Sequence, residues 1–272
     1  MSDLSPTLKE REDALFVRWK QACRLMDGID PDADFARDGL LYRGAYELIG
    51  GCWERRPGNE TELWNNASCR LLILTKDTTR ASEMDDIRIE TARKNHTSTV
   101  AVAATTPFHR NLTLWSYALL YAMQGGEALP YDNTPSWDEL STHYATAPIA
   151  RVNCKKQIGV STIQDADLGS HMERYAHFLR EQIALYDADI ILCCGGHGII
   201  KDFVKQHYLP DLQCFSSDGW VYYSPTTRKV VIDSYHPTFA KSFKSIQLYY
   251  ELMMSDVKAF IAEHPEYLRR TT

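Results

Sequence analysis

Apolar residues recur at helical spacing in several stretches of the chain. Within residues 7–27, Leu8, Leu15 and Trp19 fall on one face of this pattern, which predicts an amphipathic helix. A second helix is expected over residues 35–49, ending at Gly50-Gly51, because glycine commonly terminates helices. Further helices are expected over residues 82–95, 111–124, 168–186, 198–207 and 241–263.

Short apolar runs alternate with these helices and predict strands. Strands are expected over residues 71–74, 149–152, 189–194, 220–224 and 229–233, the last two as a hairpin. We expect residues 100–104 to form a strand or an extended segment, and 127–147 to be mostly loop with a short helix. Strands separated by helices favour parallel β-α-β units, so the sequence predicts an α/β fold, a three-layer αβα sandwich with a mostly parallel central sheet.

The length and charge of the chain limit the possible classes. A chain of 272 residues is compatible with one structural domain. We expect residues 1–66 to form a helical extension packed on an α/β domain of residues 67–272. The formal net charge is −6, whereas dedicated nucleic-acid binders usually carry a basic surface. A local basic patch is enough for such binding, so the charge disfavours this class without excluding it.

Cysteine usage and the apolar runs bear on cofactors and location. The seven cysteines are odd in number and show no C-x-x-C spacing, which disfavours a disulfide framework and a zinc site. This usage fits a reducing compartment. The polar N-terminus differs from a signal peptide, and no apolar run is long enough to span a bilayer. We therefore expect a cytoplasmic protein with no membrane contact, metal or cofactor.

Polar residues follow the predicted strands directly. Asp77, Asn153, Gly195 and His236 each stand at or just after the end of an apolar run. In sheets of parallel strands, ligands bind at the carboxyl ends of the strands. These residues are far apart in the sequence, yet we expect them to meet at one edge of the sheet and to form a binding or catalytic site there.

The order of these motifs resembles the uracil-DNA glycosylase superfamily over residues 70–260. One branch of that family has the loop G-Q-D-P-Y-H, and the matching stretch here is 75–80, with Asp77 at the family's Asp. A family strand that ends in Asn matches 149–153, and one that runs into His-Pro-Ser matches His236-Pro237-Thr238. Thr75 and Thr78 replace the family's glycine and proline. The cysteine spacing of the iron–sulfur branch is absent, so no cluster is expected.

The resemblance implies two catalytic residues. N-glycosidic cleavage passes through an oxocarbenium-like state, so a carboxylate near the sugar would stabilise the positive charge and orient water, and Asp77 is the candidate. His236 would donate a hydrogen bond to a carbonyl oxygen of the leaving base. Asn153 would read the Watson–Crick edge of a base extruded from the stack.

The resemblance also implies contacts around the base and to DNA. Phe108 would stack on the base, with Tyr235 as a weaker candidate, and the base-binding set would include Thr75 and Lys76. Phe239 could act as an apolar wedge. The residues expected to contact DNA phosphates are Thr238, Lys241, Ser242 and Lys244.

Three functions remain open from the sequence. The first is a monomeric DNA glycosylase that removes uracil or a related damaged base from single- or double-stranded DNA. The second is a non-catalytic protein of the same fold that binds nucleic acid or a nucleobase, which the altered 75–80 loop and the acidic net charge favour. The third is an unrelated doubly wound hydrolase or nucleotide-binding enzyme, although G-x-G-x-x-G, P-loop and G-x-S-x-G motifs are all absent.

Overall fold

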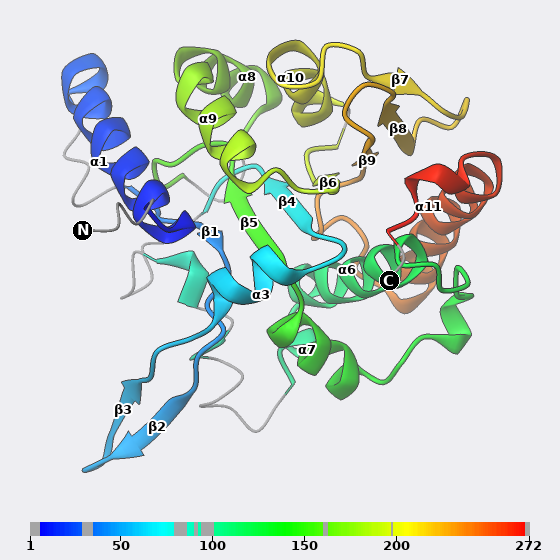
Figure 1. Cartoon of the computed structure of the whole chain (residues 1–272), viewed down its shortest axis with the longest axis horizontal. Coiled ribbons are helices and arrows are strands. Elements are labelled where there is room, and N and C mark those ends of the chain that lie inside the picture. Colours follow the sequence, from blue (N-terminus) through cyan, green and yellow to red (C-terminus); the bar gives the residue numbers. More distant parts are fainter. Residues whose placement is uncertain are drawn as a thin grey trace, which may run out of the picture.

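A seven-stranded sheet forms the centre of the molecule, and helices cover both of its faces (Figure 1). The computed structural model describes residues 6–28, 35–78, 86–89, 92–93, 101–159, 163–196 and 198–269. The strand order is β1-β5-β4-β6-β9-β8-β7. The strands are Gly39–Leu40 (β1), Leu71–Thr75 (β4), Ile149–Asn153 (β5), Ile190–Cys193 (β6), Gln213–Cys214 (β7), Val221–Ser224 (β8) and Lys229–Asp233 (β9).

The centre of the sheet is parallel. β5, β4, β6 and β9 run in the same direction, whereas the outer pairs β1–β5, β9–β8 and β8–β7 are antiparallel. All five residues of β4 are buried, because it lies between two strands and beneath helices on both faces. Such strands are continuously apolar, which is why the sequence pattern detects them. The expected α/β class and the mostly parallel centre of the sheet are confirmed.

Two groups of helices pack on the two faces of the sheet (Figure 1). Leu71 and Ile73 of β4 pack with α6, α7 and α11, and Leu72 and Leu74 pack with α1, α8, α9 and α10. The helices are Leu8–Asp27 (α1), Glu60–Asn66 (α3), Val102–Thr105 (α5), Pro107–Met123 (α6), Trp137–Thr146 (α7), Asp165–Arg174 (α8), Ala176–Tyr186 (α9), Ile199–His207 (α10) and Phe243–Glu263 (α11), with 3-10 turns at Tyr131–Asn133 and Pro265–Tyr267.

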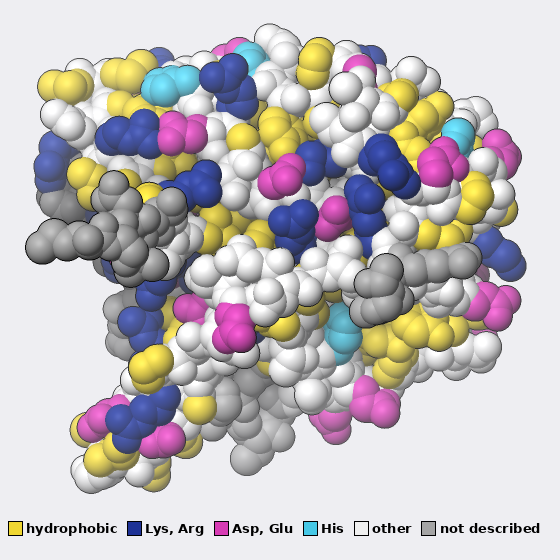
Figure 2. All heavy atoms as spheres, in the orientation of Figure 1, with side chains coloured by type: hydrophobic (Ala, Val, Ile, Leu, Met, Phe, Trp, Pro, Cys, Tyr) yellow, Lys and Arg dark blue, Asp and Glu magenta, His cyan; other side chains and the backbone are white. Residues whose placement is uncertain are grey.

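The expected helix over residues 35–49 is wrong. This stretch contains β1, which pairs with β5, and Tyr46–Ile49 (β2), which pairs with Cys52–Arg55 (β3). Gly50 and Gly51 have φ of 58° and 84° and form the turn of this hairpin rather than a helix end. Two consecutive residues with positive φ are what a tight hairpin requires. The hairpin projects from the body, with Leu48 and Trp53 61% and 47% exposed (Figures 1 and 2).

Other boundaries also differ from the sequence pattern. The long helix expected over 168–186 is two helices, α8 and α9, which meet at the non-helical Tyr175. Residues 102–105 form the helix α5 instead of a strand, because so short an apolar run does not distinguish the two. The helix expected over 82–95 lies mostly outside the described residues. Within the described chain, no helix is both long and apolar enough to cross a membrane.

Candidate functional site

The direction of the chain between strands marks one position on the sheet edge. From β4 the chain continues to β5 on one side, whereas the later strands β6 to β9 all lie on the other side of β4. In open α/β sheets, ligands bind outside the carboxyl ends of the strands at such a switch point. The register keeps these ends level, because Thr75 is paired with Asn153, and Cys193 with both Leu74 and Asp233. The residues that follow these strands therefore share one edge.

The loops after β4 and β5 hold each other beyond the ends of the strands. Backbone N–H groups of Cys154, Lys155 and Gly159 donate to the carbonyl groups of residues 75, 76 and 78 at 2.8, 2.9 and 2.8 Å. Asp77 lies within this paired segment. A Cβ atom at Gly159 would stand 2.0 Å from Asp77 Oδ2, so glycine permits this close approach. The backbone of two loops therefore defines the position of the Asp77 carboxylate.

The Asp77 carboxylate is half-buried between two cations. Burial raises the pKa of Asp77, and the charges of Lys155 and Lys76 act in the opposite direction. Its Oδ2 atom is buried and has no hydrogen-bond partner among the described residues. A partly desolvated carboxylate with an open acceptor is suited to bind a proton donor such as a water molecule.

Asn153 is buried, with 3% of its surface exposed. The Thr75 hydroxyl donates a hydrogen bond to its Oδ1 atom, and its Nδ2 atom has no hydrogen-bond partner in the described part of the chain. Buried polar atoms are nearly always hydrogen-bonded in proteins, so this amide donor is available to a water molecule or a ligand. Thr75 and Asn153, both expected at the site, are thus in direct contact.

A fully buried ion pair fixes the backbone of Asn153. Lys156 Nζ lies 2.6 Å from Asp38 Oδ1, and both side chains have no exposed surface. Asp38 Oδ2 accepts from the N–H of Asn153 at 2.8 Å, and Lys156 donates to the Asn153 carbonyl at 2.9 Å. Gln182 donates to Asp38 Oδ1 at 2.9 Å. The sequence did not reveal this network, because Asp38 and Lys156 are 118 positions apart and no local pattern links them.

His236 is a neutral imidazole with a defined tautomer. The backbone N–H of Thr238 donates to His236 Nδ1 at 3.3 Å, and the Thr238 hydroxyl contacts the same atom at 2.8 Å. Nδ1 is therefore the acceptor, and the proton resides on Nε2. Burial, assisted by the charge of Lys76, lowers the pKa of His236 to about 4. Lys76, whose Nζ lies 2.7 Å from Asp165 Oδ1, influences the pKa of both Asp77 and His236.

Helix α6 supports the His236 loop. Asn111 donates from Nδ2 to the carbonyl groups of Pro237 and Ala240, at 2.5 and 3.0 Å. The Phe108 ring is tilted towards His236, with ring centroids 5.9 Å apart, and it packs partly against the core. The sequence analysis predicted that Phe108 stacks on the base. In the structure, Phe108 lies against His236.

The residues expected to contact phosphates lie beyond this loop. Lys241, Ser242 and Lys244 are exposed at the start of α11, where the Ser242 hydroxyl accepts from the N–H of residue 245 and caps the helix. Thr238 is exposed, but its hydroxyl is engaged with His236. Phe239 is 54% exposed, and its ring stacks on Tyr235 with centroids 4.7 Å apart. Phe239 is thus part of an aromatic cluster, and its role as an apolar wedge stays a prediction.

A small cavity is lined by the segment that precedes His236. It has a volume of about 190 Å³ and opens between the ends of β6 and β9, where Gly196, Trp220, Ser234 and Tyr235 line it. Asp77, Asn153 and His236 are not among its lining residues. Among the residues that the structure describes, no group of three or more His, Cys, Asp or Glu side chains could hold a metal ion.

Comparisons with known proteins give no assignment. No protein-family model matches the chain, and a search of curated proteins found no significant match. Function is therefore inferred from the geometry and chemistry of the carboxyl edge of the sheet.

Proposed function

We propose that this protein is a DNA glycosylase of the uracil-DNA glycosylase type that hydrolyses the N-glycosidic bond of uracil or a related damaged base. One observation carries the proposal. A half-buried carboxylate, a buried amide donor and a neutral imidazole follow three parallel strands whose carboxyl ends are aligned. These are the three chemical functions that release of a nucleobase anion requires.

Asp77 acts on the sugar and on water. Cleavage builds positive charge on the sugar ring, which a nearby carboxylate stabilises. The open Oδ2 atom of Asp77 accepts a hydrogen bond from the attacking water. Lys76 and Lys155 favour the ionised form of this carboxylate, although burial opposes it. The group is thereby ready to serve as an acceptor and base.

His236 acts on the leaving base. As the glycosidic bond breaks, negative charge develops on the base and its carbonyl oxygens. The Nε2–H of His236 donates to such an oxygen, and its low pKa of about 4 keeps the ring neutral at pH 7. A fixed donor stabilises developing charge without transferring its proton completely.

Asn153 selects the edge of the base. Because Thr75 occupies Oδ1, the side chain presents its Nδ2 donor to a ligand. A donor is complementary to a carbonyl oxygen and opposes an exocyclic amino group, which is itself a donor. The proposal therefore favours uracil over cytosine as the base that is released.

The test is incubation with an end-labelled oligonucleotide that carries one uracil, single- or double-stranded, followed by alkali. We expect strand breakage at the uracil position and none at cytosine. Asp77→Asn should reduce the rate by about 100-fold or more while the protein stays folded. Asp132→Asn, at an exposed acid in a 3-10 turn, is the matched control and should retain full activity. Absence of breakage by the folded wild-type protein on every uracil substrate would refute the proposed activity on uracil.

A second candidate is a non-catalytic protein that binds a nucleobase or nucleic acid. The contact of Thr75 with Asn153 favours it, because threonine replaces the family's glycine at this point and engages the base-reading amide. This candidate predicts binding of uracil-containing strands that weakens with salt, without base release. Detection of an abasic product would rule it out.

A further inference from the structure

Three aromatic side chains gather beside the His236 loop. The Phe239 ring stacks on Tyr235 with ring centroids 4.7 Å apart and an interplanar angle of 12°. The Tyr249 ring lies 5.2 Å from Phe239 and 4.9 Å from Tyr235. Tyr235 and Tyr249 are partly buried against the core, whereas Phe239 is 54% exposed. Phe239 is therefore the solvent-facing ring of this aromatic cluster.

The Phe239 ring has one face open to solvent. Tyr235 covers the other face. The three ring centres form a triangle with sides of 4.7, 4.9 and 5.2 Å, so Tyr249 cannot lie over the face of Phe239 that is opposite to Tyr235. A wedge that enters a base-pair step contacts bases on both of its sides. Phe239 offers a single face, which is the geometry for stacking on one base.

The backbone holds this ring close to the candidate active site. The N–H of Phe239 donates to the carbonyl group of His236 at 2.8 Å, so the two residues belong to one tight turn. Asn111 donates to the carbonyl groups of Pro237 and Ala240, on either side of Phe239 in the sequence. A ring on a fixed turn loses little conformational freedom when a ligand stacks on it.

Positive charge lies next to the aromatic cluster. Lys241 follows Phe239 by two positions, so their Cα atoms are at most about 7 Å apart, and Lys244 lies in the first turn of α11. Both lysines are exposed, and neither is in an ion pair with another described residue. Residues 234–250 contain these two lysines and no Asp or Glu. This charge is complementary to the phosphates that flank a stacked base.

Acidic side chains near this segment belong to a different surface. Asp218 and Asp233 line the small cavity together with Tyr235, whereas Phe239, Lys241 and Lys244 do not line it.

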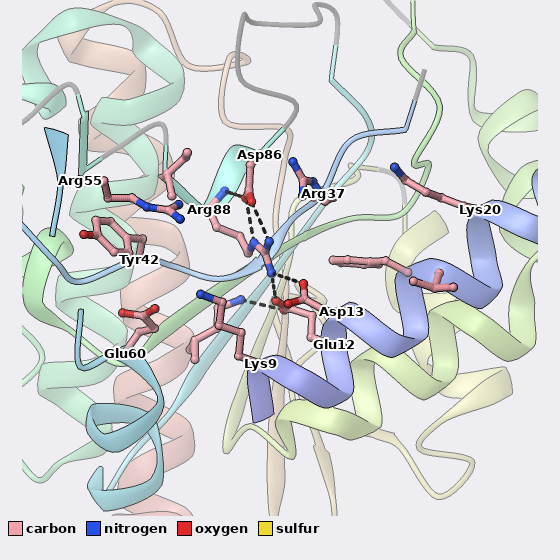
Figure 3. Close-up of a pocket in the computed structure, with 14 residues that line it drawn as sticks. Lys9, Glu12, Asp13, Lys20, Arg37, Tyr42, Arg55, Glu60, Asp86 and Arg88 are labelled. Carbon is pink, nitrogen blue, oxygen red and sulfur yellow. Dashed lines mark hydrogen bonds and ion pairs between the residues drawn. The ribbon is translucent and has the colours of Figure 1, made fainter. Parts of the chain in front are cut away.

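A larger cavity beside α1 has charges that largely compensate one another. Its volume is about 630 Å³, and Arg88 at its centre donates to Glu12 and Asp86 and lies 3.4 Å from Asp13 (Figure 3). Its lining carries five basic and four acidic side chains. The cavity therefore offers a polyanion less uncompensated charge than Lys241 and Lys244 do.

We infer that Phe239 is a stacking platform for an unpaired base of single-stranded DNA, with Lys241 and Lys244 on the neighbouring phosphates. The inference rests on the proposed function for its choice of DNA as the ligand. In a duplex, each base is stacked between its neighbours, so a ring with one open face has no base to receive. Aromatic platforms combined with basic side chains are the means by which proteins hold single strands.

The experiment is fluorescence anisotropy with a dye-labelled DNA strand that lacks uracil, either alone or annealed to its complement. We expect the single strand to bind about tenfold more tightly than the duplex, or better. Phe239→Leu keeps an apolar side chain but removes the ring face, so it should weaken single-strand binding about 5- to 100-fold, whereas Phe239→Trp should retain it. Lys241→Gln should reduce the slope of log affinity against log salt by about 0.7.

The matched control is Tyr121→Leu. Tyr121 is 39% exposed and stacks on Tyr117 with an interplanar angle of 8°, much as Phe239 stacks on Tyr235. It follows Asn111 by ten positions in α6, a separation of about 15 Å along the helix. This variant should bind both DNA forms as wild type does. Thermal unfolding checks that each variant is folded.

The inference fails if the single strand does not bind, if Phe239→Leu binds it as tightly as wild type, or if Lys241→Gln leaves the salt slope unchanged. It also fails if Phe239→Leu weakens duplex binding as much as single-strand binding, which is the result expected for a wedge. These outcomes do not depend on base release, because the strand holds no uracil. Failure of the proposed function alone would appear as Phe239-dependent binding of the single strand without breakage of any uracil substrate.

Discussion

The positions of the candidate site residues at the carboxyl edge of the sheet are set by contacts with neighbouring residues. Asp77 reaches its position because residue 159 has no side chain, and Asn153 presents a donor because the Thr75 hydroxyl engages its carbonyl oxygen. These contacts involve a few atoms only. Their loss should therefore change the site more than it changes the stability of the fold.

Replacement of Gly159 by alanine tests this at the residue scale. The new Cβ would lie 2.0 Å from Asp77 Oδ2, so the carboxylate must move, and the end of a side chain moves at little energetic cost. We expect a change in unfolding free energy below about 1 kcal/mol, but a loss of base release of about 100-fold, because small misplacements of a reacting group are costly.

The matched control for this substitution is Gly169→Ala. A Cβ at this position in α8 would meet only Ile199 Cδ1, at an ordinary distance of 3.5 Å. Alanine also favours helix, so we expect a gain of about 0.5–1 kcal/mol in stability with unchanged activity. Full activity in Gly159→Ala would show that the position of Asp77 is irrelevant to the reaction.

At the scale of elements, the buried Asp38–Lys156 pair joins the segment before β1 to the segment after β5. It carries both backbone contacts of Asn153, so the edge strand takes part in shaping the candidate site. Buried ion pairs are often neutral for stability when both partners are replaced by apolar residues, whereas removal of one partner is costly. Mutation can therefore separate the contribution of this pair to the stability of the fold from its role in positioning Asn153.

Two variants make this separation. Lys156→Met leaves the Asp38 carboxylate buried without its cation and should cost about 3–5 kcal/mol of unfolding free energy. The double variant Asp38→Leu, Lys156→Met should recover much of that loss in urea denaturation, but base release should stay low because Asn153 loses both anchors. A double variant with wild-type turnover would assign the pair a purely structural role.

At the scale of the whole molecule, burial of histidines links stability to pH. Burial lowers the pKa of His143, and it lowers those of His171 and His236 to about 4 from an ordinary value of 6.5. Between pH 4 and 6.5 the unfolded chain therefore binds protons at His171 and His236 that the native chain does not. Stability should rise with pH wherever the unfolded state binds more protons.

We expect His236 to leave the free energy of unfolding unaffected above pH 6.5 and to lower it progressively as the pH falls from 6.5 towards 4. Urea denaturation at several pH values in this window measures it. His236→Asn should show a weaker loss of stability on acidification than wild type, whereas His177→Asn, at an exposed position of α9, should match wild type. Equal pH dependence in wild type and His236→Asn would contradict a lowered pKa of His236.

The sequence by itself determined the parallel centre of the sheet and the polar residues that follow it. Residues 71–74 and 190–193 are apolar throughout because both faces of these strands are covered, and that pattern is local. The same runs predict that Asp77, Asn153 and His236 stand at or just after the ends of strands. Their catalytic and base-binding roles stay a prediction.

Only the tertiary structure decided how the first 66 residues join the sheet and which distant side chains come into contact. β1 has two residues and is defined by its partner β5, more than a hundred positions later, so it leaves no periodic signal. The Asp38–Lys156 pair likewise brings together charges from separate segments. Contacts of this kind depend on packing between distant parts of the chain, and local hydrophobic patterns carry no information about them.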